Sequence, residues 1–243
     1  MIPQLEKESK EFVKLLQVMR KLRDPQNGCP WDLNQTHQSI RSNLLEETHE
    51  ALEALDNNDK TLMVEEFGDV LFQVIFHAQI AEDEESFGIY DVLQNIVSKL
   101  ITRHPHVFGD TESMTTDKVL FQWEQIKAKE RAQKQNNGQS ILDGIPKSMP
   151  ALAAAQSMNS RVRRTNLLEN SKDSSIEQII ILFNEAEKNT NLIMREQEIG
   201  KALFLLADKA DVLGIDAESA LRSANEKFRF QIKEIESNAK GVE

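Results

Sequence analysis

The chain has 243 residues, and its 29 lysines and arginines against 40 aspartates and glutamates give a net charge of −11. So acidic a chain is a poor general binder of nucleic-acid phosphates, which attract an excess of lysine and arginine. The single cysteine, Cys29, excludes an intramolecular disulfide, and the scarcity of turn residues (9 Gly, 6 Pro) favours an all-α fold.

Helical periodicity dominates the first half of the chain. It predicts helices at 6–22, 39–55, 62–81 and 90–103, and a fifth near 119–135. Asn57 and Asn58 separate the second helix from the third, and Pro105 follows the basic end of the fourth, as is typical of a helix C-terminus.

The composition changes after Arg131 to Gln, Asn, Gly, Pro and Ser, which predicts a linker over residues 136–150. A second helical set is then expected at 151–164, 175–188, 192–213 and 217–237. We therefore predict two tandem helical-bundle domains: a catalytic domain over 1–135 and a degenerate second domain over 151–243.

The two halves resemble each other. The segment EFGDVLF at 66–72 is similar to EIGKALF at 198–204, and each is followed by a loop and a further helix. This pattern indicates a tandem duplication of one helical unit rather than a short-period repeat.

The third predicted helix carries one polar stripe in an otherwise apolar surface. At about 100° per residue, the stripe contains Glu66, Asp69, Gln73 and His77. A helix that is apolar nearly all round is expected to be buried, so the stripe should face other protein, where unpaired carboxylates are costly.

The preceding helix adds a second acidic pair. Glu47 and Glu50 lie on one helical face, and the short connection makes the two helices antiparallel neighbours. Four carboxylates would then converge with no lysine or arginine among them. All-oxygen ligation favours Mg²⁺, with Mn²⁺ as a substitute. The alternative is that such acidic pairs are simply solvated on the helix surface. For a single pair, this is the more common case.

Four further side chains are candidates for substrate contacts. Lys99 and Arg103, four residues apart, suit a phosphate chain, although a basic last turn also complements a helix dipole. Trp123 and Lys127, one turn apart, suit a base and a phosphate, although a tryptophan at helical spacing is commonly a core residue.

The sequence motifs do not support a P-loop phosphate site or catalysis through a covalent intermediate. The segment GIPKS at 144–148 lacks the glycine that precedes lysine in a P-loop, and no G-x-S-x-G motif is present. Two rival functions stay open. One is a di-iron carboxylate bundle, because Glu46 and His49 form a Glu-x-x-His element. The other is a non-catalytic helical nucleotide-binding or scaffold protein.

Five motifs in order resemble one known family. They are GCPWD at 28–32, EETHE at 46–50, EFGD at 66–69, RHPHVF at 103–108 and WEQIK at 123–127. Together they resemble the MazG family, nucleoside triphosphate pyrophosphohydrolases of the all-α NTP pyrophosphatase superfamily. The resemblance implies Mg²⁺-dependent cleavage of an NTP or dNTP between its α- and β-phosphates, giving NMP and pyrophosphate.

The resemblance also implies roles for individual residues. The metal ligands would be Glu47, Glu50, Glu66 and Asp69, with Glu46 beside them as a water-activating group or extra ligand. Lys99 and Arg103 would contact phosphates, and Trp123 and Lys127 would close the nucleotide pocket.

The second copy departs from this pattern. Lys201 replaces the metal-binding aspartate, and we expect the broken acidic signature near Glu185 and Glu187. We therefore predict one active site, in the first domain.

We also expect a homodimer or higher homo-oligomer, as is typical of the family. The acidic balance predicts no nucleic-acid partner. No apolar run approaches the roughly 18 residues of a membrane span, and residues 1–14 do not read as a signal peptide, so a cytoplasmic location without membrane contact is expected.

Overall fold

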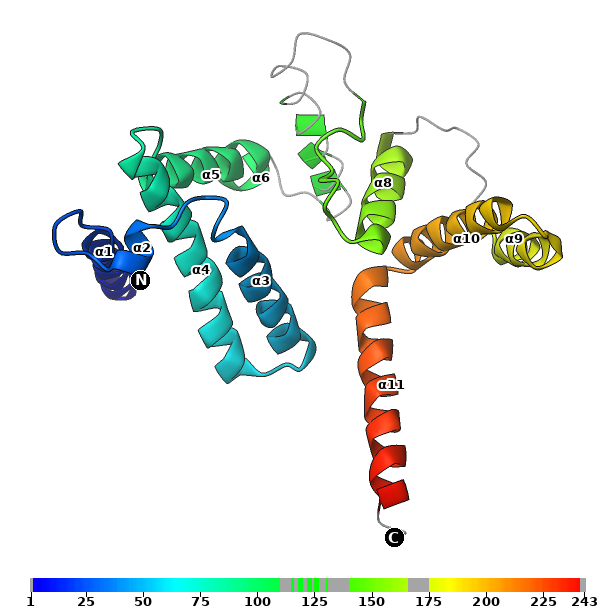
Figure 1. The fold of residues 1–243 in the computed structure, drawn as a ribbon. Helices are drawn as coiled ribbons and strands as arrows, with labels where there is room; N and C mark the ends of the chain where they lie inside the picture. Colours follow the sequence, from blue (N-terminus) through cyan, green and yellow to red (C-terminus); the bar gives the residue numbers. More distant parts are fainter. Residues whose placement is uncertain are drawn as a thin grey trace. The chain divides into compact units, whose positions relative to one another are not determined.

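The computed structural model describes residues 2–109, 140–165 and 175–240, with isolated positions between 115 and 130. Every regular element in these parts of the chain is an α-helix (Figure 1), which confirms the expected all-α fold. Contacts divide the chain into two compact units, Met1–Thr111 and Glu112–Glu243. The predicted domain boundary at 135 lies outside the described residues and stays a prediction.

The predicted helices lie within a few residues of those in the structure. The first unit contains α1 (Ile2–Leu22), α2 (Pro30–Leu33), α3 (Arg41–Asp56), α4 (Lys60–Asp83), α5 (Ile89–Arg103) and α6 (Pro105–Phe108). The second contains α8 (Ala151–Thr165), α9 (Ile176–Lys188), α10 (Leu192–Val212) and α11 (Ala217–Lys240). The short helices α2 and α6 were not predicted. Most of the helix expected near 119–135 falls outside the described residues.

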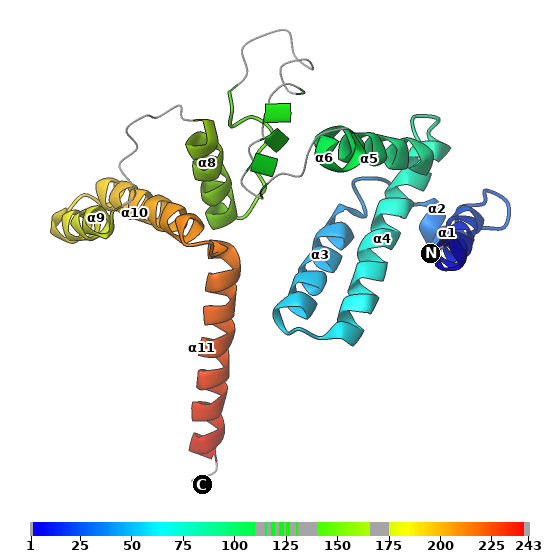
Figure 2. The ribbon, with the colours of Figure 1, turned by 180° about the vertical axis from the view of Figure 1, so that it is seen from behind.

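Helices α3 and α4 form an antiparallel hairpin, side by side in Figures 1 and 2. Asp59 begins α4 by accepting hydrogen bonds from the backbone N–H groups of Thr61 and Leu62, as an N-cap residue does. Ala51 and Ala54 are the buried residues of α3. Their small side chains let the two helix backbones approach closely.

The core of the first unit lies at the C-terminal half of α4. Its buried members are Met19 of α1, Ile40 before α3, and Ile75, Phe76 and Ile80 of α4. Because α1, the segment before α3 and α4 all contribute, this core fixes the α3–α4 hairpin against the rest of the unit.

A buried arginine ties three segments together next to this core. Arg23, at the end of α1, donates from Nε to Asp83 Oδ2 at 2.5 Å. Its Nη1 donates to the carbonyl oxygens of Asp32 and Gln35 at 2.5 and 3.2 Å. The guanidinium also lies 5.7 Å from the centre of the Phe76 ring. This side chain therefore anchors the α2 segment on α4.

The surface of α4 is less completely buried than its composition predicts. Its polar stripe is buried at Glu66 and Gln73, as expected, but Val64, Phe67, Leu71 and Val74 are exposed by 37–78 %. The reason is that α3, α1 and α5 pack on only part of the helix circumference. The described residues of the first unit leave an apolar face of α4 uncovered.

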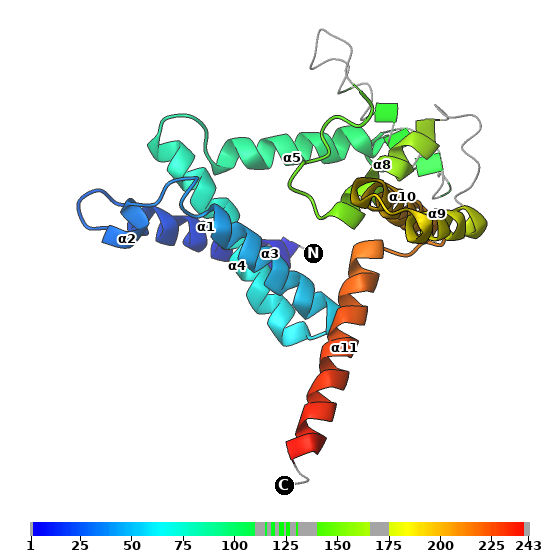
Figure 3. The ribbon, with the colours of Figure 1, turned by 45° about the vertical axis from the view of Figure 1, so that its right-hand side comes forward.

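The second unit repeats the hairpin. Helices α9 and α10 pack together, and α8 packs on α10 (Figure 3). Their core contains Ile179, Leu182 and Ala202, with Leu205 against it. Arg163 of α8 pairs with Asp208 and Asp211 of α10. In both units a further helix therefore packs on the second helix of the hairpin.

Within the described residues, none of the helices has the length and apolar character needed to span a membrane.

Candidate metal centre

Three carboxylates converge between α3 and α4. Single oxygen atoms of Glu47, Glu66 and Asp69 lie within 4.8 Å of one another. Glu66 and Asp69 share a face of α4 because they are three residues apart, and the hairpin brings Glu47 of α3 opposite them. The sequence predicted this convergence, and the structure shows it for three of the four expected ligands.

The electrostatics of this cluster are unfavourable without a cation. Burial raises the pKa of Glu47 above its ordinary value, and the neighbouring charges of Asp69, Glu50 and Glu46 raise it further. The pKa of Glu66 is also raised, chiefly by burial and then by the surrounding carboxylates. Among the described residues, no lysine or arginine contributes to either shift. Among these described residues no cation offsets the carboxylates, so the cluster favours a bound positive ion.

The donor set fits a hard divalent cation. All three convergent groups are carboxylates, the oxygen donors that Mg²⁺ and Mn²⁺ prefer. Glu66 is only 7 % exposed, and its Oε2 atom is buried without a hydrogen-bond partner. Such an atom is costly unless a ligand satisfies it. His49, which the di-iron alternative requires, is exposed and is not part of this group.

The other two acids of α3 lie at the edge of the cluster. Glu50 is exposed, and none of its atoms belongs to the convergent group, yet its charge raises the pKa of both Glu47 and Glu66. Glu46 is exposed as well and acts on Glu47 through its charge. Both carboxylates are therefore close enough to the cluster for their charges to change the pKa values of its members.

The predicted phosphate-binding residues lie on α5. Lys99 and Arg103 are half-buried and four residues apart, so they share one face of that helix. Helix α5 packs on α4, the helix that carries Glu66 and Asp69. Their contact with a phosphate stays a prediction.

The predicted pocket-closing pair is only partly described. Trp123 lies at a helical position and is half-buried, whereas Lys127 lies outside the described residues. Trp123 belongs to the second compact unit. The role of this pair stays a prediction.

The structure adds two features to which the sequence assigned no role. Gln73 is 4 % exposed, and its interaction with Glu47 partly offsets the rise in the pKa of that carboxyl. One turn further along α4, His77 Nδ1 lies 2.8 Å from His37 Nδ1, with the two rings stacked. The only signal in the sequence was that Gln73 and His77 continue the polar stripe. The contact of His77 with His37 joins residues forty positions apart.

The second unit has a different arrangement at the same place. Both hairpins have connections of equal length, Asn57–Asp59 and Asn189–Asn191. Counting from them aligns Glu66 with Glu198 and Asp69 with Lys201. Lys201 Nζ pairs with Glu198 Oε1 at 2.8 Å.

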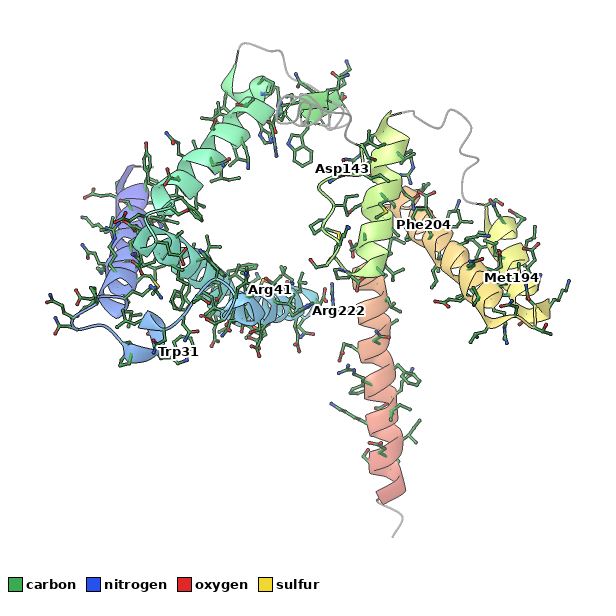
Figure 4. All side chains as sticks on the ribbon, turned by 45° about the horizontal axis from the view of Figure 1, so that its top comes forward. Trp31, Arg41, Asp143, Met194, Phe204 and Arg222 are labelled. Carbon is green, nitrogen blue, oxygen red and sulfur yellow. The ribbon has the colours of Figure 1, made fainter. Side chains whose placement is uncertain are left out.

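The sequence predicted the counterparts of the α3 acids near Glu185 and Glu187, close to the C-terminal end of α9. The hairpin register instead aligns Glu47 with Ile179 and Glu50 with Leu182, both buried in the core of the second unit. In Figure 4, Met194 and Phe204 mark the two ends of the α10 segment that carries Glu198 and Lys201.

Comparison with known proteins points to one family. Residues 35–108 match the MazG nucleotide pyrophosphohydrolase domain. A nucleoside triphosphate pyrophosphohydrolase of Escherichia coli K12 is 42 % identical over 237 residues, covering 95 % of this chain and 89 % of the relative. A Thermotoga maritima protein, nucleoside triphosphate pyrophosphohydrolase/pyrophosphatase MazG, is 38 % identical over 93 % of this chain and 85 % of its own length. The Bacillus subtilis protein YabN, 40 % identical, matches over 48 % of its length.

Proposed function

The chain belongs to the MazG family and is a nucleoside triphosphate pyrophosphohydrolase, and we propose that it cleaves NTPs or dNTPs between the α- and β-phosphates, with Mg²⁺, in its first unit. The products are a nucleoside monophosphate and pyrophosphate. The observation that carries this proposal is the convergence of Glu47, Glu66 and Asp69 without a compensating lysine or arginine among the described residues.

The cluster residues have separate tasks in this proposal. Glu47, Glu66 and Asp69 hold the metal, and the exposed Glu50 turns inward as a further ligand. When bound, Mg²⁺, or Mn²⁺ in its place, polarises phosphoryl oxygens and lowers the pKa of a bound water. Glu46, at the rim, orients the attacking water or adds a ligand.

Cationic side chains neutralise the triphosphate. Lys99 and Arg103 present two positive groups on one face of α5, which packs on the helix of Glu66 and Asp69. In the proposed reaction they stabilise the charge that develops on the departing pyrophosphate. The family resemblance assigns Trp123 and Lys127 to the nucleotide pocket.

The second unit is assigned a structural role. The ammonium group of Lys201 lies beside Glu198, at the place where a divalent ion would need a carboxylate. On the facing helix, the buried Ile179 and Leu182 stand at the positions that correspond to Glu47 and Glu50. These substitutions support a single active site per chain.

A homo-oligomer, most simply a homodimer, is part of the proposal. The exposed apolar face of α4, formed by Val64, Phe67, Leu71 and Val74, lies on the helix of the metal ligands. Covering it with the same face of a second copy would remove apolar surface from water. A cytoplasmic location and the absence of a nucleic-acid partner stay predictions from composition.

The decisive experiment separates the products of single NTPs. Purified protein is incubated with each NTP and Mg²⁺, and NMP, NDP, pyrophosphate and orthophosphate are resolved by chromatography. The proposal expects NMP and pyrophosphate in equal amounts. Release of NDP and orthophosphate would contradict the assigned bond, and the absence of any product would favour a non-catalytic nucleotide-binding role.

A further inference from the structure

A histidine contact joins α3 and α4 at the end of their hairpin that the chain leaves open. At the other end, the connection 57–59 joins the two helices. At the open end, the segment 34–40 leads into α3, and His37 Nδ1 lies 2.8 Å from His77 Nδ1 of α4. Ile40 anchors the same segment in the core of the unit. The contact between the two histidines therefore adds a polar tie to an apolar anchor.

The two rings are placed for one hydrogen bond. Their planes make an angle of 5° and their centroids are 5.1 Å apart, so the two Nδ1 atoms face each other between the rings. A separation of 2.8 Å holds a single hydrogen. In the neutral pair one ring donates and the other accepts, and a pair with one extra proton keeps the same bond. A second extra proton would set two N–H groups and two positive charges against each other.

The surroundings of His77 also oppose its charged form. Burial, and next the charge of His37, lowers the pKa of His77 below its ordinary value. The Nε2 atom of His77 is buried without a hydrogen-bond partner, whereas a charged ring needs an acceptor for each of its two N–H groups. The doubly protonated pair would therefore lack both its mutual hydrogen bond and a partner for this Nε2 atom.

Other charged groups lie on the elements around α4. They are Arg23 of α1, Asp32 of α2, Glu47 and Glu50 of α3, and Lys99 and Arg103 of α5. Arg23 is paired with Asp83 of α4 itself, and Glu47 belongs to the carboxylate cluster. None of these charges contributes to the pKa of His77. Among the described residues, a proton on His37 is therefore the charge to which His77 responds.

We propose that the His37–His77 contact is a pH-sensitive latch on the open end of the hairpin. The latch is closed while the pair carries at most one extra proton, and it opens when both rings are protonated. Opening releases the segment 34–40 from His77 and leaves the start of α3 more weakly held. The latch is independent of the proposed hydrolytic function, because neither histidine belongs to the carboxylate cluster.

The direction of the pH effect follows from the number of bound protons. Above about pH 6.5, the ordinary pKa of histidine, His77 is neutral in both the closed and the open state. Below this value, the open state binds a proton on His77 that the closed state, with its lowered pKa, excludes. The equilibrium constant for opening therefore rises by up to about tenfold per pH unit as the pH falls from 6.5 to the lowered pKa. Acid opens the latch, and a return to neutral pH closes it.

The substitution His77→Asn separates the hydrogen bond from the proton. The amide Oδ1 of asparagine is bonded to Cγ, as Nδ1 is in histidine, so it accepts the hydrogen of His37 but takes up no proton. His77→Leu removes the hydrogen bond altogether. The matched control is His49→Asn, because His49 is an exposed histidine of α3 that has no part in the contact.

The measurement is amide hydrogen exchange of the segment 34–40 in the full chain, followed by mass spectrometry at about pH 5 and about pH 7.5. Each variant is compared with wild type at the same pH, so the intrinsic pH dependence of exchange cancels. We expect the ratio of the wild-type rate to the His77→Asn rate to be at least about fivefold larger at the lower pH. His77→Leu should exchange faster than wild type at the higher pH, and His49→Asn should match wild type at both.

Two results would overturn the latch. If the ratio of the wild-type rate to the His77→Asn rate is equal at both pH values, the segment opens without proton uptake by His77. If His77→Leu exchanges at the wild-type rate at the higher pH, the contact does not hold the segment. Should His77→Asn not fold by circular dichroism, His37→Asn presents the reciprocal acceptor to the Nδ1–H of His77, and the same ratio measured with that variant decides.

Discussion

Lys201 Nζ lies 2.8 Å from Glu198 Oε1, at the two positions of α10 that correspond to Asp69 and Glu66 of α4. In the second unit the lysine provides a positive charge, whereas no described lysine or arginine contributes to the pKa shifts of Glu47 and Glu66 in the first unit. The same kind of hairpin therefore carries a lysine ammonium group beside a glutamate in the second unit. In the first unit it carries a carboxylate cluster with no compensating lysine or arginine among the described residues.

This relationship predicts that one substitution cannot restore a metal site in the second unit. Lys201→Asp recreates the acidic pair on α10 but leaves Ile179 and Leu182 on the facing helix. We expect calorimetry to detect no additional Mg²⁺ or Mn²⁺ equivalent in this variant compared with wild type. A second bound equivalent would show that the facing helix is not needed for binding.

The first unit should lose its function when Asp69 loses its charge. Asp69→Asn keeps the side-chain volume but removes one of the three converging carboxylates. We expect NTP hydrolysis to fall by about 100-fold or more, with helicity by circular dichroism near that of wild type. Lys201→Ala, at the corresponding place in the second unit, is the matched control and should retain full activity.

Stabilisation by Mg²⁺ should depend on pH because the pKa values of Glu47 and Glu66 are raised from 4.5. Between that value and the raised pKa, the folded protein binds more protons than the unfolded chain. Without metal, this contribution makes the free energy of unfolding fall as pH rises through the window. Metal requires the deprotonated carboxylates, so the Mg²⁺-induced increase in Tm should be larger at about pH 7.5 than at about pH 5.

The measurement is a thermal melt with and without MgCl₂ at both pH values, with Asp69→Asn as the control that shows little Mg²⁺ response at either. An equal Tm shift at both pH values in wild type would mean that protons and Mg²⁺ do not compete for these carboxylates.

The buried arginine should contribute to stability rather than to chemistry. Arg23→Met removes the pairing with Asp83, which is itself 34 % exposed, and leaves the carbonyls of Asp32 and Gln35 without this donor. We expect a loss of about 2 kcal/mol in the free energy of unfolding by urea. Arg20→Met is the control, because its pair with Glu82 is exposed on both sides. An equal loss in both variants would contradict the special role of Arg23.

The exposed face of α4 should control the oligomeric state. Val64 and Leu71 are two turns apart on that face and are 78 and 41 % exposed. In the double variant Val64→Arg and Leu71→Arg, light scattering coupled to size exclusion should show a smaller species than wild type. Thr61→Arg, at an exposed polar position of the same helix, should leave the mass unchanged.

The helices and the acidic pairs followed from the sequence because they depend on local spacing. Periodicity placed α3, α4, α9 and α10 within a few residues of their observed ends. The i, i+3 spacing put Glu66 and Asp69 on one face, and the short connection implied an antiparallel hairpin that brings Glu47 to them. Helix geometry is set by nearest neighbours along the chain, so these inferences needed no tertiary information.

Tertiary packing decided the rest. The contact between His37 and His77 joins separate segments, and the burial of Gln73 depends on how the helices pack. The equal length of the two hairpin connections, which aligns Ile179 rather than an acid with Glu47, came from the helix ends in the structure. The sequence by itself determined which residues share a helical face, whereas only the folded chain determined which faces meet.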